Sequence, residues 1–445
     1  MVGAIIRRNI ATSVLLKGGT LLLQLATLPI LFHALGGADY GIWATMQSII
    51  VWFTLFDFGI TLALRNRLTA ALAREETDAA LEYVSTAFLV QGVLWFGVVV
   101  IAGLIVFAGG VPWASWFRSD SSDLQIGKGL WYCLTTLAVS QWLGCVNSIL
   151  CARHWNSLTA IPSLASNGLV LLWVILARWN GSPLSIEQLA WMQLVCMAFS
   201  YSIHGFLVFW NDLGLLPRFS HVSRQRFSEI STLGWQFLLL QLAHVAIATT
   251  DRWVVLRYLG PEAAAEYDVL FRLFAIITTG HALLVAPMWA LSGAAWARGN
   301  AVELQKLFRI TAGWSGLGLV GVLVMGVLFR PLVSVWIDAN LSFSSPLILS
   351  YMVCAGLVIW NGGVSTLLNG TGRVREQTWV CLLSTVINLP LSILFCSTFR
   401  WGMLGVVIAS CIALLCYSVV GWWVWLSLMR EVTTTERQPS PEGRG

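Results

Sequence analysis

Long, uninterrupted runs of apolar residues recur along the whole chain. A transmembrane helix needs about 20 such residues, because the hydrocarbon core is ~30 Å thick and a helix rises 1.5 Å per residue. The runs are continuous rather than alternating, which predicts helices and not the strands of a barrel. We count twelve predicted spans, at residues 10–34, 42–64, 84–108, 128–150, 157–178, 188–211, 233–257, 266–290, 308–329, 346–368, 378–397 and 401–428.

The composition supports this interpretation. Of the 445 residues, 57% are hydrophobic and only 11% are charged, whereas about a quarter of the residues of a soluble domain are charged. The mean hydropathy is +0.77. These values exclude an ordinary soluble protein and predict an all-α polytopic membrane protein with about 12 transmembrane helices.

The distribution of lysine and arginine predicts the orientation. The loops on one side of the predicted membrane hold 17 of the 26 cations, and the loops on the other side hold 6. Since cytoplasmic loops are rich in these residues, we predict a multi-pass protein of the bacterial inner membrane with both termini in the cytoplasm. Arg7 and Arg8 precede the first apolar run, but that run is too long for a signal peptide, so we expect it to be retained.

The chain shows a weak internal repeat. The sequence LLLQLA begins at Leu21 and again at Leu238, and a Leu-Gly pair follows at Leu35 and at Leu259. A parallel repeat of six spans is typical of transporters and predicts two pseudo-symmetric six-helix bundles around a central cavity. The predicted parts are an N-terminal bundle at 1–212, a basic cytoplasmic linker at 213–232, a C-terminal bundle at 233–428 and a disordered cytoplasmic tail at 429–445.

Several charged residues fall inside the predicted spans of the first half. Each charge near the centre of a membrane helix costs about 2.5 to 3.5 kcal/mol on insertion scales, so it needs a compensating interaction or a function. Lys17 and Asp57 lie at similar depth, about 7 to 10 Å from the cytoplasmic face, on neighbouring antiparallel spans. We therefore expect these two side chains to pair.

The second half carries charges near the predicted outer ends of its first two spans. Asp251 and Arg252 lie near the end of the seventh span, and Asp268 and Arg272 lie in the first turns of the eighth. Because the two spans form a hairpin, these two carboxylates and two guanidinium groups are expected to converge.

The intramembrane charges allow two interpretations. They could be structural ion pairs that hold each bundle together, or the cations could bind an anionic headgroup, since the guanidinium fork of arginine suits phosphate. The candidates for substrate binding are Lys17, Arg65, Arg252 and Arg272, and the candidates for exchange of a coupling ion are Asp57 and Asp251.

Motifs for metal or nucleotide chemistry are absent from the sequence. Its nine cysteines form no CxxC pair, its six histidines have no metal-ligand spacing, and no Walker-type phosphate loop occurs. We expect no metal and no cofactor. A membrane enzyme of lipid-linked glycan assembly is an alternative of a different class, but the longest predicted outer loop offers only the carboxylates Asp120 and Asp123.

Three stretches of the sequence carry a family resemblance: LGGADYGIW, DFGITLALRNRL and DRWVVLRYLGPEAAAEYDVLFRL. They resemble the O-antigen and capsular polysaccharide flippases of the multidrug, oligosaccharidyl-lipid and polysaccharide exporter superfamily. The number of spans, the internal repeat and the order of the repeated sequence motifs extend the likeness over nearly the whole chain. One departure is Asp268, since relatives more often have a small or polar residue after this tyrosine. The motifs that match the family place its functional positions at Asp57, Arg65, Asp251, Arg252 and Arg272.

The resemblance implies a transporter and not an enzyme. Such a flippase moves undecaprenyl-diphosphate-linked oligosaccharide across the inner membrane by alternating access, coupled to an ion gradient. The implied partners are the lipid-linked glycan, H⁺ or Na⁺, membrane lipids, a polysaccharide polymerase and glycosyltransferases, but no nucleic acid. A cation-coupled drug exporter of the same superfamily is the closer alternative, although a net charge of +5 and three intramembrane cations favour an anionic cargo.

Overall fold

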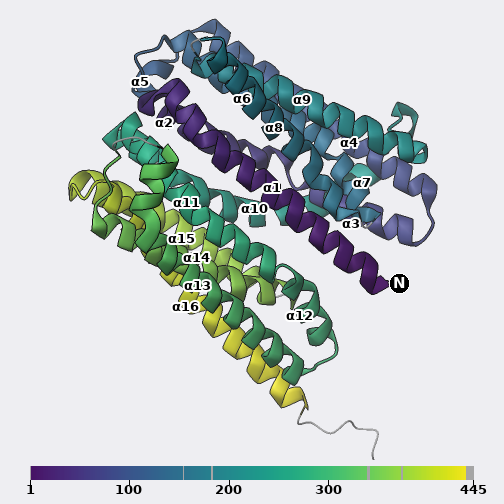
Figure 1. Ribbon diagram of the computed structural model, residues 1–445. Coiled ribbons are helices and arrows are strands. Elements are labelled where there is room, and N and C mark those ends of the chain that lie inside the picture. Colours follow the sequence, from purple (N-terminus) through teal and green to yellow (C-terminus); the bar gives the residue numbers. More distant parts are fainter. Residues whose placement is uncertain (1, 154, 182–183, 338–340, 372–373, 437–445) are drawn as a thin grey trace, which may run out of the picture. The chain divides into compact units, whose positions relative to one another are not determined.

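The computed structural model describes residues 2–436 except 154, 182–183, 338–340 and 372–373 (Figure 1). These residues form helices and turns and no strand. The α-helices are α1 (Val2–Leu35), α2 (Gly37–Trp52), α3 (Ile60–Ala73), α4 (Thr77–Ala108), α5 (Trp113–Phe117), α6 (Asp123–Gly144), α7 (Val146–Ala152), α8 (Ile161–Trp179), α9 (Ile186–Asn211), α10 (Arg224–Leu259), α11 (Pro261–Val285), α12 (Pro287–Ala297), α13 (Ala301–Ile337), α14 (Ser345–Gly370), α15 (Val374–Ile393) and α16 (Met403–Glu436).

The helices account for the predicted spans. Within the described residues, ten helical segments are long and apolar enough to cross a membrane, and a bent pair made by α2 and α3 raises the number to eleven. The seventh predicted span lies on α10, a helix of 36 residues, some of whose side chains lie outside the described set. The prediction of an all-α polytopic membrane protein is confirmed.

The chain divides into two compact units. Unit 1 comprises Met1–Val245 and Gly260–Ala265, and unit 2 comprises Ala246–Leu259 and Glu266–Gly445. The change of unit falls within α10 and at the start of α11, so both helices belong to two units. The predicted ranges of the two bundles and the linker stay predictions.

The predicted disordered tail needs a correction at its start. Residues 429–436 continue α16 without a break, because no helix-breaking residue occurs before Pro439. Residues 437–445 lie outside the described residues.

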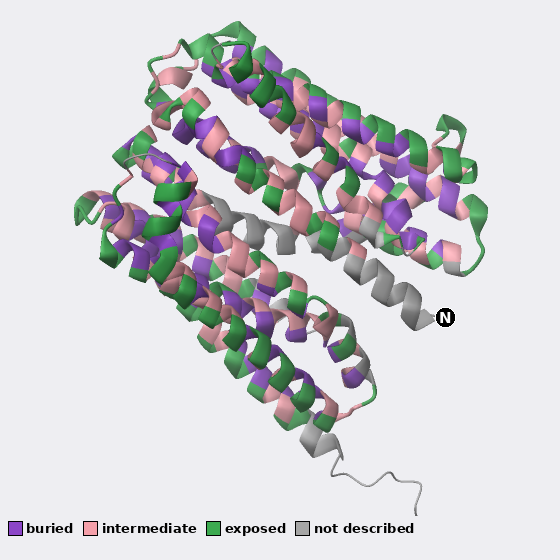
Figure 2. Ribbon diagram, viewed as in Figure 1, coloured by how far each residue is buried: buried purple, intermediate pink, exposed green. Residues whose placement is uncertain are grey.

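Each unit is a bundle of long helices with apolar outer surfaces. In unit 1, α6 packs against α4 and α9, and in unit 2, α16 packs against α14 and α15. Figure 2 shows exposed residues along the lengths of these helices and not only at their ends. Many of the exposed residues are large and apolar: Phe96 of α4 is 72% exposed and Val327 of α13 is 79% exposed. Such surfaces suit contact with lipid.

The second predicted span is broken, where the sequence predicted a continuous helix over 42–64. Helix α2 is followed by a 3₁₀ turn at Phe53–Asp57, and α3 begins at Ile60. Between them, Phe58 and Gly59 have φ of 48° and 69°, a left-handed conformation that glycine adopts without cost. The two parts of the span meet at a bend of 45°.

Two segments of unit 1 approach each other closely through their backbones, at Gly41 and at Pro261. Gly41 follows Tyr40 in α2, and Pro261 follows the Leu-Gly pair that ends α10. A Cβ atom on Gly41 would lie 1.8 Å from the carbonyl oxygen of Pro261. Only glycine permits this contact, which explains why the stretch LGGADYGIW carries a glycine after its tyrosine.

Candidate functional site

Asp251 anchors a buried polar network in unit 2. Its Oδ2 atom accepts hydrogen bonds from the Tyr267 hydroxyl of α11 and the Ser410 hydroxyl of α16, each at 2.8 Å. The amide of Asn388 on α15 donates to Ser410 Oγ at 3.3 Å, and Ser392 Oγ donates to Asn388 Oδ1 at 2.8 Å. Three other helices, α11, α15 and α16, therefore contribute polar groups to the network around the Asp251 carboxylate.

The other oxygen of Asp251 is not used in this network. Asp251 Oδ1 is buried and has no hydrogen-bond partner among the described residues. An unpartnered buried acceptor is costly, and an ionised carboxylate inside a membrane protein is more so. A proton or a small cation at Oδ1 would remove this cost. Carboxylate, hydroxyl and amide oxygens from Asp251, Ser410 and Asn388 are ligand types that a hard cation accepts.

The residues directly after Asp251 and Tyr267 on the same hairpin belong to an ion-pair cluster. Asp268 of α11 is 1% exposed and receives guanidinium groups on both oxygens. Arg252 of α10 lies 2.7 Å from Oδ1, and Arg272, one turn further along α11, lies 2.6 Å from Oδ2. The Arg252 guanidinium also stacks 4.2 Å from the ring centre of Phe271. The expected convergence of two arginines at this hairpin is thus observed.

The hairpin of α10 and α11 sets the two sites side by side. Asp251 faces Tyr267, and its neighbour Arg252 faces Asp268. Asp251 therefore makes no ion pair with Arg272 within the described residues, since Asp268 receives that arginine. Two carboxylates and two guanidinium groups balance in charge while Asp251 is ionised. Among these four groups, neutralising Asp251 leaves an excess of one positive charge.

Asp57 has a different environment, at the break between α2 and α3 in unit 1. Its Oδ1 atom accepts a hydrogen bond from the Thr61 hydroxyl at 2.7 Å and from the Thr61 backbone N–H at 3.3 Å. The side-chain amide of Gln91 on α4 also donates to Oδ1. The carboxylate thus lies at the N-terminus of α3, where backbone N–H groups and the helix dipole favour a negative charge.

The expected pairing of Lys17 with Asp57 is not formed. The described residues contain no ion pair between these two side chains, and Lys17 is exposed on α1. The reason is the break at Phe58 and Gly59, which ends the straight path on which the depth estimate rested. Asp57 meets α4 instead, while α1 packs against α8.

Arg65 lies on the exposed side of α3, in unit 1. It makes no ion pair within the described residues. Both Arg65 and Lys17 lie within electrostatic range of the Cys151 thiol of α7. These two predicted substrate-binding cations therefore share one region of unit 1, and Arg252 and Arg272 share another in unit 2.

We expect Asp57→Ala to lower the stability of the protein, because it removes the acceptor of Thr61 in the first turn of α3 and leaves the buried Gln91 amide without this acceptor. The loss should be about 1 to 3 kcal/mol. Lys17→Ala removes no hydrogen bond or ion pair to the described residues and should keep normal membrane abundance. The measurement is abundance in isolated membranes together with the unfolding temperature. Similar losses in both variants would restore the ion-pair interpretation.

Three residues of these sites were not singled out from the sequence: Tyr267, Ser410 and Gln91. Tyr267 directly precedes Asp268, a carboxylate expected at the hairpin of the seventh and eighth spans, so the same hairpin geometry could have placed it near Asp251. Ser410 and Gln91 lie far along the chain from their carboxylates, and the sequence contains no comparable signal for them.

Comparison with known proteins identifies the family. The family model described as polysaccharide biosynthesis protein matches residues 6–288. A protein of Salmonella typhimurium named as an O-antigen transporter is 20% identical over 334 residues, which cover 74% of this chain and 75% of that protein. A protein of Yersinia pseudotuberculosis named as an O-antigen export protein is 17% identical over 427 residues, which cover 93% of each.

Solved structures show the same fold. The inward-facing structure of a multidrug resistance MATE family transporter of the MOP superfamily has a TM-score of 0.76 at 13% identity, with 95% of this chain and 96% of that chain covered. A MOP superfamily transporter from Pyrococcus furiosus, described as having a binding pocket of reversed polarity, has a TM-score of 0.69 at 13% identity, with 98% and 96% covered. The resemblance inferred from the motifs is confirmed. The chain belongs to the polysaccharide biosynthesis protein family and has the fold of the MOP transporters.

Proposed function

We propose that this protein flips undecaprenyl-diphosphate-linked oligosaccharide from the cytoplasmic to the periplasmic leaflet by alternating access, driven by an ion gradient. The membership of the polysaccharide biosynthesis family and the O-antigen relatives support a lipid-linked sugar as the cargo. The transporter fold supports movement across a membrane and not an enzymatic reaction.

The observation that carries the proposal is the charge arrangement on the hairpin of α10 and α11. Two arginines converge on one carboxylate, Asp268, inside a membrane-spanning bundle. Arg272 keeps 27% of its side chain exposed, so part of its guanidinium group can meet a ligand. Arginine binds phosphate oxygens in a bidentate manner, and a diphosphate headgroup needs such counter-charge on its way through the bilayer.

Asp251 is the better of the two candidates for the coupling ion. Asp57 accepts hydrogen bonds from Thr61, in the first turn of α3, and from Gln91, and these bonds stabilise its charge in place. Asp251 instead has a buried oxygen without a hydrogen-bond partner in the described structure. Loading Asp251 with H⁺ or Na⁺ would leave Arg252 and Arg272 in excess over Asp268. Ion binding and anion binding would therefore favour each other, as coupling requires.

The proposed site of action is the bacterial inner membrane, with both termini in the cytoplasm. This orientation rests on the 17 cations in the loops of one side against 6 on the other. The proposed partners are the lipid-linked glycan, the coupling ion, and the polymerase and glycosyltransferases that would act on the same glycan.

A drug exporter of the same superfamily is the competing function, because solved multidrug transporters share the fold. Deleting the gene in its own bacterium separates the two. The proposal predicts loss of surface polysaccharide and accumulation of its lipid-linked precursor, both restored by the wild-type gene, with unchanged drug susceptibility. Normal surface polysaccharide together with increased drug sensitivity would favour drug export.

A further inference from the structure

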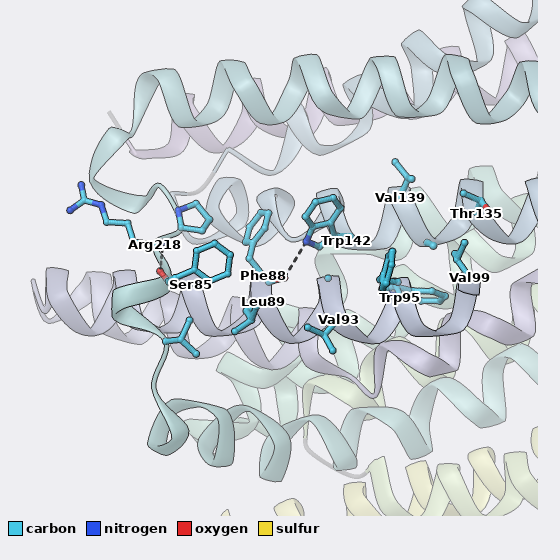
Figure 3. Close-up of a pocket in the computed structure, with 16 residues that line it drawn as sticks. Ser85, Phe88, Leu89, Val93, Trp95, Val99, Thr135, Val139, Trp142 and Arg218 are labelled. Atoms are coloured by element: carbon cyan, nitrogen blue, oxygen red, sulfur yellow. Dashed lines mark hydrogen bonds between the residues drawn. The ribbon is translucent and has the colours of Figure 1, made fainter. Parts of the chain in front are cut away.

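A groove runs along the outer surface of unit 1, between α4, α6 and the segment that precedes α10. Its volume is about 560 Å³, within the range of small-ligand sites. Figure 3 shows a row of apolar side chains along it, with Arg218 at one end and Val99 at the other. The lining includes Phe88, Val93, Val139 and Trp142.

The groove lies on helices with the length and composition of membrane spans. Val93 is 65% exposed and Trp142 is 41% exposed, on helices that are long and apolar enough to span the membrane. Two polar groups of its wall are engaged within the protein: Trp142 Nε1 donates to the Phe88 carbonyl at 3.1 Å, and Ser85 Oγ accepts from the backbone N–H of Arg218 at 3.0 Å. Trp95 Nε1 also belongs to the wall; it is buried and has no hydrogen-bond partner among the described residues. The wall therefore suits an acyl chain better than a sugar.

The length of the groove matches one leaflet. From Ser85 to Val99, α4 rises about 21 Å at 1.5 Å per residue. One leaflet contributes about half of the ~30 Å hydrocarbon core, and the headgroup region adds several ångströms. A chain that starts at Arg218 would thus end near the middle of the bilayer.

The end of the groove at Arg218 carries an available positive charge. The Arg218 side chain is exposed, points outward past the row of apolar residues (Figure 3), and makes no ion pair within the described residues. The carboxylates of this region have other partners, since Glu82 and Glu229 bind Arg226 and Asp212 binds Arg153. Basic groups at this level attract anionic lipids.

We propose that the groove binds one acyl chain of an anionic glycerophospholipid, with the phosphate of its headgroup at Arg218. A single guanidinium group matches a singly charged phosphodiester. The glycan carrier is a poorer fit here, because a diphosphate with attached sugars would need more cations and free hydroxyl or amide partners than this end of the groove supplies.

The bound lipid would also support the segment that joins the two halves of the chain. Two hydrogen bonds fix this segment to α4. The backbone N–H of Arg218 donates to Ser85 Oγ, and the backbone N–H of Ser223 donates to Thr86 Oγ1, each at 3.0 Å. Pro217, Arg218 and Phe219 also line the groove. Occupation of the groove should therefore stabilise this segment, as any ligand stabilises the state to which it binds.

Native mass spectrometry of the purified full-length protein can test this proposal. The protein is titrated with phosphatidylglycerol and with phosphatidylcholine of identical acyl chains. We expect one phosphatidylglycerol to bind in preference to phosphatidylcholine. Arg218→Gln should reduce this preference about fivefold. The matched control is Arg224→Gln, since Arg224 is an exposed arginine of the same region that does not line the groove.

A second pair of variants tests the groove itself. Val93→Trp places an indole in the groove and should displace the lipid, whereas Val100→Trp, on the same helix but outside the lining, should not. Equal effects of Arg218→Gln and Arg224→Gln would show diffuse surface attraction and overturn the proposal. Unchanged binding of phosphatidylglycerol in Val93→Trp would also overturn it. Displacement of bound phosphatidylglycerol by an equimolar amount of undecaprenyl diphosphate would overturn it as well.

Discussion

Asp268→Ala is expected to remove most of the protein from the membrane fraction. The variant leaves Arg252 and Arg272 without the buried carboxylate that both now contact. Breaking a buried ion pair by removing one partner costs about 3 to 5 kcal/mol, a large part of the 5 to 15 kcal/mol that stabilises a typical protein. Quantitative immunoblotting of membranes and the unfolding temperature of the residual protein measure the loss.

The matched control for this variant is Glu303→Ala. Glu303 pairs with Arg298 at the same 2.7 Å, but the side chains are 35% and 58% exposed. Exposed pairs contribute at most about 1 kcal/mol, so this variant should accumulate normally. If both variants were equally abundant, Asp268 would have no structural role, and the cluster would have to be interpreted through ligand binding alone.

Asp251→Asn should abolish glycan export while the protein stays at normal abundance. The asparagine side chain keeps the shape of aspartate, and its oxygen can still accept from Tyr267 and Ser410. It cannot be neutralised by a proton and carries no charge to hold Na⁺, so the proposed coupling is lost. Surface polysaccharide should fall to the background of the deletion strain, whereas the unfolding temperature should stay close to that of the wild-type protein, because Tyr267 and Ser410 keep their acceptor.

Asp57→Asn is the control that separates the two candidate ion sites. The side-chain oxygen of asparagine can accept the same hydrogen bonds from Thr61 and Gln91, so α3 should keep its start and export should continue. Export that fails in Asp57→Asn but persists in Asp251→Asn, with both proteins stably inserted, would assign the coupling ion to unit 1 and contradict the proposed role of Asp251.

The positions of the spans could be predicted because length and composition alone decide whether a helix is stable in a bilayer. The meeting of Arg252, Asp268 and Arg272 could also be predicted, since a short hairpin between two spans brings their facing turns together. Both inferences use only local chain geometry. They hold wherever the helices are straight and neighbours in sequence are neighbours in space.

The environment of Asp57 could not be predicted in the same way. The depth estimate assumed a straight second span, and the sequence DFG was treated as part of it. Aspartate and glycine both favour turns, but the long apolar run around Asp57 and Gly59 made a single span the simpler hypothesis. The partner Gln91 lies on α4, so no pattern within the second span indicates it.

The unpartnered oxygen of Asp251 is a property of tertiary packing. Its neighbours Asn388 and Ser410 come from α15 and α16, and more than a hundred residues of chain separate them from α10. Polar residues in these spans were recognisable as hydrogen-bonding groups. Their convergence on one carboxylate became visible only with the arrangement of the four helices.

The central claim is that ion binding at Asp251 drives movement of a diphosphate-linked oligosaccharide, and reconstituted flipping tests it most directly. Purified protein is placed in liposomes with undecaprenyl-diphosphate-linked oligosaccharide, an H⁺ or Na⁺ gradient is imposed, and a lectin added outside reports glycan that has crossed. The account predicts flipping that requires the gradient in the wild-type protein and is absent in Asp251→Asn. Equal flipping by both proteins, or no flipping of the glycan while a cationic dye is exported, would contradict it.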